Sequence, residues 1–147
     1  MLARKRGLAL LAAFAALPGC GGGDDDAQPV ETATQPAVAS DQRGVLQTID
    51  ALQSASRRGA GADICGDLFT PRLVRSLERA STRDCATEVR TRLFRRDDVI
   101  SVQRGIEVEG TSATAVIRKG DGDVSTLHML KLAGRWRIDR VTPAGPS

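Results

Sequence analysis

Apolar residues in the middle of the chain recur every three or four positions, which is the spacing of one face of an α-helix. The first such stripe comprises Val45, Leu46, Ile49 and Leu52. Ser40 or Asp41 can cap this helix at its start, and the glycines of Gly59-Ala60-Gly61 end it. The pattern predicts an amphipathic helix from this cap to Arg58, with one side against a core.

Two more helical segments follow. Their apolar residues form three groups, which are Ile64, Cys65, Leu68 and Phe69; Leu73, Val74 and Leu77; and Cys85, Val89 and Leu93. Thr70-Pro71 has the form of an N-cap with proline at the first helical position. Ser81 or Thr82 is expected to start the third helix. Glu88 and Arg92 lie four residues apart in it, a spacing that favours an ion pair.

After Ile100 the period of the apolar residues changes from about 3.6 to 2, which indicates strands. Four alternating segments cover residues 100–108, 113–117, 124–132 and 135–141. The links between them are short and rich in turn residues, including Gly110-Thr111, Gly120-Asp121-Gly122-Asp123 and Ala133-Gly134. Short links favour an antiparallel meander. Helices first and strands afterwards predict an α+β fold, with the helices on one face of the sheet.

The N-terminal segment has the pattern of an export signal. Arg4, Lys5 and Arg6 precede an apolar run from Leu8 to Leu17, which is shorter than the roughly 20 residues that span a bilayer. Leu17-Pro18-Gly19-Cys20 follows and resembles the lipobox of bacterial lipoproteins. The resemblance implies cleavage before Cys20 and lipid on its sulfur, and hence a lipid anchor on the extracytoplasmic face of the cell membrane. The alternatives are an uncleaved membrane anchor or cleavage elsewhere, with Cys20 an ordinary residue.

The domain organisation follows from this segment. Residues 1–19 are the predicted signal peptide. Residues 20–39 are poor in bulky apolar side chains and are expected to form a flexible tether, which as a random coil would span about 25 Å. Residues 40–147 form one small domain.

Removal of the signal changes the charge of the protein. The whole chain has 21 basic and 18 acidic residues, a net charge of +3. Three of the basic residues lie in the signal, so the remainder is formally neutral. The chain has three Phe, one Trp and no Tyr, which leaves few rings on which bases could stack. We therefore expect no nucleic-acid partner.

Three cysteines would leave one unpaired in an exported protein. If Cys20 carries lipid, Cys65 and Cys85 remain as a pair, and an oxidising compartment favours a disulfide between them. Two free buried thiols or a metal site are the alternatives. Two cysteines without nearby histidines make a poor zinc site, and catalysis by one of them would need His128, the one histidine of the chain. We expect no metal and no cofactor.

The final strand, Gly134-Arg135-Trp136-Arg137-Ile138-Asp139, resembles the Gly-x-Trp-x-Ile strand of the NTF2-like superfamily, and the segment from Gly105 to Ala115 resembles the strand turn of the same proteins. The resemblance implies three N-terminal helices packed on a curved four-stranded antiparallel sheet that forms a cone. In actinobacterial lipoproteins of this kind, cysteines in the second and third helices are common. The positions of Cys65 and Cys85 match this pattern.

The candidate pocket residues are His128 and Trp136. Trp136 is expected to pack across the sheet onto the helices, with its indole N–H satisfied. Enzymes of this superfamily use an acidic or histidine base inside the cone, and the resemblance implies that an active site of this chain would lie there too. Here the base would be His128, provided that its strand face is the concave one.

The leading hypothesis is a non-catalytic lipoprotein that binds a small apolar ligand or an envelope protein. The alternative is an isomerase or lyase of the ketosteroid-isomerase type. Gly120-Asp121-Gly122-Asp123 is interpreted as a turn and not as a calcium loop, because it lacks the ligand spacing.

Overall fold

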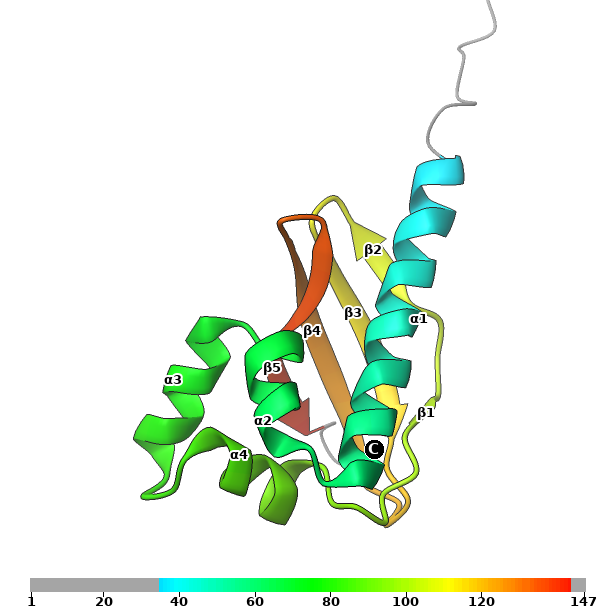
Figure 1. Cartoon of the computed structure of the whole chain (residues 1–147). Coiled ribbons are helices and arrows are strands. Elements are labelled where there is room, and N and C mark those ends of the chain that lie inside the picture. Colours follow the sequence, from blue (N-terminus) through cyan, green and yellow to red (C-terminus); the bar gives the residue numbers. More distant parts are fainter. Residues whose placement is uncertain (1–34, 144–147) are drawn as a thin grey trace, which may run out of the picture. The chain divides into compact units, whose positions relative to one another are not determined.

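The computed structural model describes residues 35–143, in which all helices precede all strands (Figure 1). The predicted signal peptide, Cys20 and most of the predicted tether lie outside the described residues. The elements in chain order are α1 Gln35–Arg58, α2 Gly61–Asp63, the π-helix η1 Ile64–Leu68, α3 Pro71–Ala80, α4 Cys85–Glu88, the π-helix η2 Val89–Leu93, β1 Ser101–Val102, β2 Glu107–Glu109, β3 Ser112–Arg118, β4 Val124–Leu132 and β5 Arg135–Pro143. The α+β class predicted from the sequence is confirmed.

Helix α1 begins earlier than predicted. It starts at Gln35, so Ser40 and Asp41 are not its caps and residues 35–39, assigned to the tether, are helical. Ala37 and Ala39 have high helix propensity, which extends the helix N-terminally without a contribution from the core. The predicted end is confirmed, because α1 stops at Arg58 and Gly59 has a φ of +68°, a conformation that glycine adopts without strain.

The buried side of α1 differs at one position from the predicted stripe. Val45, Ile49 and Leu52 are buried as expected, but Leu46 is 43% exposed. Residue 46 lies about 100° around the helix from residue 45, and the core side continues instead through Thr48. The Thr48 hydroxyl donates to the carbonyl oxygen of Gly44, one turn back, and lies 3.2 Å from that of Trp136 on β5. A polar residue on the buried side thus links the helix to the sheet.

The middle of the chain contains two short helices that widen into π-helical turns. The Phe69 N–H donates to the carbonyl of Ile64, and the Phe94 N–H donates to that of Val89. Each wide turn ends at a phenylalanine, and both rings are buried. The rings meet edge to face with their centroids 6.5 Å apart. The two turns therefore place the two phenylalanine rings against each other in the core.

Of the two caps predicted for the middle helices, the first is confirmed and the second is wrong. Thr70 caps α3, with its hydroxyl accepting from the Leu73 N–H at 3.2 Å. The cap of α4 is Asp84 and not Ser81 or Thr82. Its carboxylate accepts from the Thr87 N–H at 2.9 Å. A carboxylate at a helix N-terminus is favoured over a hydroxyl by the helix dipole. The predicted pair of Glu88 and Arg92 is present at 3.1 Å.

The sheet is antiparallel, as predicted, but has five strands instead of four. The segment from Ile100 to Val108 was expected to form one strand. It is divided into β1 and β2, which both pair with β3. Residues 104–106 between them leave the ladder near Gly105, a residue that weakens strands, whereas the Gln103 N–H still donates to the Val116 carbonyl at 2.8 Å. Strands β3, β4 and β5 follow as hairpins. The turn between β4 and β5 has positive φ at both Ala133 and Gly134, the conformation that suits a two-residue hairpin.

The core lies between the helices and one face of this sheet. On that face the strands contribute Ala113, Ala115, Ile117, Leu127, Met129, Trp136 and Ile138, all of them buried. The intervening residues on the other face are half-buried or exposed. We call this second side the open face and define it by Thr114, Val116, Thr126, His128 and Leu130. This division decides which residues can share a pocket.

Candidate functional site

His128 lies on the open face and not between the sheet and the helices. Its neighbours along β4, Leu127 and Met129, point into the core and are 0% and 1% exposed, so alternation directs His128 to the opposite side. Across the sheet it is paired with Thr114 on β3 and Arg140 on β5. The helices therefore do not cover the face of the sheet on which His128 lies.

The chemistry around His128 favours a neutral imidazole. Its Nε2 lies 3.2 Å from the Thr142 hydroxyl, and no carboxylate hydrogen-bonds to the ring among residues 35–143. Partial burial lowers the pKa of His128, the positive charge of Arg140 lowers it further, and Asp139 opposes these effects. A neutral histidine beside a hydroxyl resembles a structural hydrogen-bonding pair more than an oriented catalytic base.

Trp136 lies on the other face of the sheet, packed against α1. It is 6% exposed, which confirms that it packs across the sheet onto the helices. The ring lies against Gly44, where an added Cβ would be 2.8 Å from the indole Cδ1. The Lys131 ammonium is 5.9 Å from the ring centroid and is paired with Asp41 of α1. His128 and Trp136 therefore do not share a pocket.

The indole N–H of Trp136 was predicted to have a hydrogen-bond partner, and the structure shows none among the described residues. Its Nε1 is buried and has no hydrogen-bond partner in the described part of the chain. The nitrogen faces Gly44, where an added Cβ would be 3.2 Å away, and helix backbone at this contact offers it no free acceptor. Sequence reasoning missed the role of Gly44, although a glycine inside a predicted helix is a signal of close packing.

Two open depressions lie on the sheet, of which the smaller borders Trp136 and neither is lined by His128. One of about 290 Å³ lies between α1, η1 and the β4–β5 turn, and Gly44, Thr48, Leu68 and Trp136 are among its lining residues. A larger one of about 970 Å³ lies at the far end of the sheet, around Val116, Arg118, Val124 and Thr126. The side chains of Phe69, Phe94, Leu127 and Ile138 are at most 1% exposed and occupy the space between the sheet and the helices.

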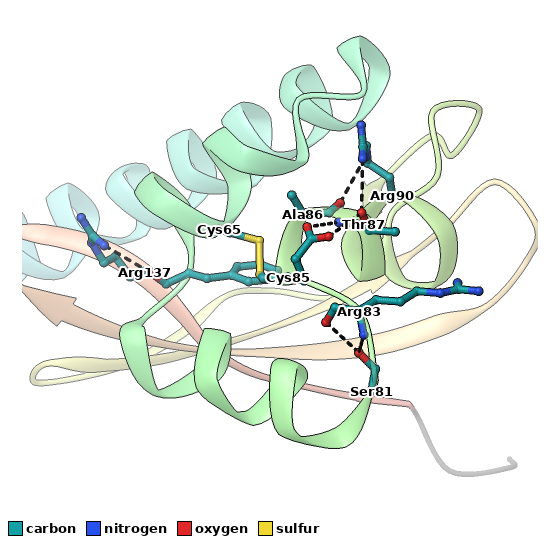
Figure 2. The surroundings of a disulfide bond; sticks show 10 residues. Cys65, Ser81, Arg83, Cys85, Ala86, Thr87, Arg90 and Arg137 are labelled. Atoms are coloured by element: carbon teal, nitrogen blue, oxygen red, sulfur yellow. Dashed lines mark hydrogen bonds between the residues drawn. A yellow bond between two sulfur atoms is a disulfide. The ribbon is translucent and has the colours of Figure 1, made fainter.

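Cys65 and Cys85 form a disulfide, as predicted, with the sulfurs 2.01 Å apart. Figure 2 shows the bridge joining η1 to the first residue of α4. Close packing accompanies it, because a Cβ on Gly61 would lie 2.4 Å from the carbonyl oxygen of Ala86. The bridge thus joins the two short helical pairs covalently.

Asp139 is a partly buried polar residue that sequence reasoning did not single out. Its carboxylate accepts from the Thr70 hydroxyl at 2.8 Å and pairs with Arg72 at 3.3 Å. Next to it, the Thr70 N–H donates to the carbonyl of Ile138 at 2.9 Å. These contacts attach the start of α3 to the edge of β5. They account for Asp139 as a structural residue.

The residues that the structure describes contain no group of three or more histidine, cysteine or acidic side chains placed to hold a metal. Among the same residues, no helix is both long enough and apolar enough to cross a membrane. The predicted lipidation site, Cys20, lies outside residues 35–143. The turn of Gly120 to Asp123 joins β3 to β4, and the Asp121 carboxylate in it binds Arg95 at 2.7 Å.

Comparison with known proteins establishes the fold. No family model matches the chain, and no curated protein matches it. Among solved structures, the chain is similar to an NTF2-like protein of unknown function from Shewanella baltica OS155, with a TM-score of 0.52 and 15% sequence identity. The match covers 79% of this chain and 98% of that one. The described residues therefore have an NTF2-like α+β fold.

Proposed function

We propose that this protein is a non-catalytic lipoprotein of the cell envelope. Lipid on Cys20 anchors it to the extracytoplasmic face of the membrane, and its NTF2-like domain binds another envelope protein. The Leu17-Pro18-Gly19-Cys20 segment supports the anchor, since several acyl chains together give stable membrane attachment. The disulfide between Cys65 and Cys85 agrees with an oxidising compartment.

One observation carries the choice of a protein partner over a small apolar ligand. The space between sheet and helices is filled by side chains such as Phe69, Phe94 and Leu127, each at most 1% exposed. A small apolar ligand needs a concave site that encloses most of its surface, and the depressions at Trp136 and Val116 are open. The open face instead offers the half-buried apolar side chains of Val116, Val124 and Leu130 on the paired strands β3 and β4.

The isomerase or lyase alternative receives no support from the position of His128. The residue lies on the face of the sheet away from the helices, its hydrogen bond goes to Thr142, and buried side chains fill the space between the sheet and the helices. We therefore propose the binding function alone.

The test uses the full chain expressed with its signal in a bacterial host. A photoreactive amino acid replaces Thr126 on the open face, and a matched variant carries it at the exposed Asp50 on α1. We expect a discrete crosslinked protein with the Thr126 probe and none with the Asp50 probe. Equal labelling from both positions would contradict a partner at the open face. A small molecule that copurifies at one per chain in native mass spectrometry would favour the apolar-ligand version instead.

The anchor is tested separately. Cys20→Ser is expected to abolish lipid attachment and to move the protein from the membrane fraction to the soluble fraction, or to block processing. Cys65→Ser, which removes a different cysteine, should leave any retained protein in the membrane fraction. A Cys20→Ser protein that is processed and anchored as before would overturn the lipoprotein assignment.

A further inference from the structure

Helix α3 carries a stripe of arginines on its solvent side. Arg72, Arg75 and Arg79 follow each other at spacings of three and four residues, which places them on one face. The opposite side of the helix contributes Leu73 and Leu77 to the core. All three arginines are exposed. Arg72 pairs with Asp139, whereas Arg75 and Arg79 have no acidic partner within residues 35–143.

Positive charge is concentrated in this part of the domain. Six arginines and three acidic residues lie between Pro71 and Leu93, a net charge of +3, while the other described residues have 12 basic and 11 acidic side chains, a net charge of +1. Two of the three acids are already engaged. Asp84 caps α4, and Glu88 is 7% exposed and paired with Arg92. The arginines therefore dominate the surface potential here.

A hollow adjoins the stripe at the C-terminal end of α3. It has a volume of about 370 Å³ and is lined by Ser81, Thr82, Arg83, Glu88 and Arg92. Figure 2 shows the Arg83 side chain extending away from the loop that follows α3. Its guanidinium hydrogen-bonds to the Thr91 hydroxyl at 3.5 Å through one nitrogen, and it has no acidic partner within residues 35–143. Guanidinium groups bind phosphate oxygens through pairs of parallel N–H donors.

We propose that this arginine surface, defined as Arg72, Arg75, Arg79, Arg83 and Arg92, docks on the phosphate headgroups of an anionic membrane. The inference rests on the proposed lipid anchor, which would keep the domain close to such headgroups. Residues 20–34 fully extended would reach about 50 Å, more than the roughly 36 Å length of α1. Because the tether can extend farther than the length of α1, the domain can rotate until α3 faces the lipid.

The test measures binding to vesicles without the anchor. The chain from residue 20 onward is produced with Cys20→Ser. It keeps the described core, whose buried apolar residues all lie between Val45 and Ile138. Each arginine near an anionic surface contributes roughly fivefold to partitioning. We expect the protein to bind phosphatidylglycerol vesicles in 0.1 M salt but not phosphatidylcholine vesicles. The Arg75→Gln/Arg79→Gln/Arg83→Gln variant should bind about a hundredfold more weakly.

The matched control is Arg104→Gln/Arg135→Gln/Arg140→Gln, which removes the same charge from exposed arginines elsewhere. It should bind within a few-fold of the parent, and circular dichroism should show both triple variants folded. Absence of binding to phosphatidylglycerol, or an equal loss in both triple variants, would overturn the proposal. Binding of soluble polyphosphate through the same arginines, as tight as binding to phosphatidylglycerol vesicles, would also overturn the proposal, because the ligand of this surface would then be a soluble polyanion. Since these proteins carry no lipid, failure here is separate from failure of the Cys20→Ser test in cells.

Discussion

The indole ring of Trp136 lies directly on the backbone of Gly44, so that a Cβ on residue 44 would be 2.8 Å from Cδ1 of the ring. The contact joins the last strand to the middle of α1, and the Thr48 hydroxyl near the Trp136 carbonyl reinforces it at 3.2 Å. Residues 44 and 136 are far apart in sequence, yet each has the size that the other requires.

Gly44→Ala is expected to destabilise the domain although alanine is the better helix former. The gain in helix propensity is about 1 kcal/mol, whereas forcing a methyl group against a fixed ring costs roughly 2–3 kcal/mol. The net loss in the free energy of unfolding should be about 1–2 kcal/mol, measured by urea denaturation. Gly66→Ala is the control, because a Cβ there meets nothing within 4 Å. Equal stability of the two variants would show that the close contact is absent.

Substitution of Trp136 should separate ring packing from the indole N–H. Trp136→Ala removes a buried ring and should cost about 3–5 kcal/mol. Trp136→Phe keeps most of the apolar contact and also removes a buried donor that has no partner in the described part of the chain. Because an unsatisfied buried donor is itself unfavourable by about 1–3 kcal/mol, this variant should lose less than about 1.5 kcal/mol. Comparable losses from both variants in denaturant titrations would mean that the N–H has a partner.

The disulfide should account for a large part of the stability. The Cys65→Ala/Cys85→Ala variant is expected to unfold with a free energy about 3 kcal/mol lower than the parent, since the bridge closes a loop across 20 residues. Reductant should lower the parent to the level of the variant and leave the variant unchanged. Non-reducing peptide mass analysis should find Cys65 joined to Cys85. Two free thiols in protein exported by its host would contradict the bridge.

His128 should make the stability depend on pH in the weakly acidic range. Burial and Arg140 hold its pKa below the ordinary value of 6.5. The unfolded state therefore binds the proton more readily, and stability should fall as the pH drops from about 6.5 through the folded pKa. His128→Gln should flatten this part of the profile and leave the decline below pH 4 that carboxylates cause. An NMR titration that gave His128 a pKa above 6.5 would reverse the sign and refute the expectation.

Much of the fold could be predicted because it follows from local patterns. The period of three to four residues marked the helices, and the period of two marked the strands. The Thr70 cap, the positive φ at Gly59 and the Ala133-Gly134 turn depend on a few neighbouring residues each. The start of α1 was misplaced, because alanines propagate a helix without a boundary signal. The division of the segment from Ile100 to Val108 was missed, because both pieces keep the same alternation.

The sequence by itself determined the α+β class, the order of helices before strands, and the expectation that Cys65 pairs with Cys85. The export signal and the lipid on Cys20 stay predictions. These depend on residue type and spacing along the chain. Only the tertiary structure decided that His128 and Trp136 lie on opposite faces of the sheet and that the helix-covered side is filled. Alternation separates two faces of a strand, but which face the helices cover depends on packing between residues far apart. The approach of Trp136 to Gly44 depends on the same long-range packing.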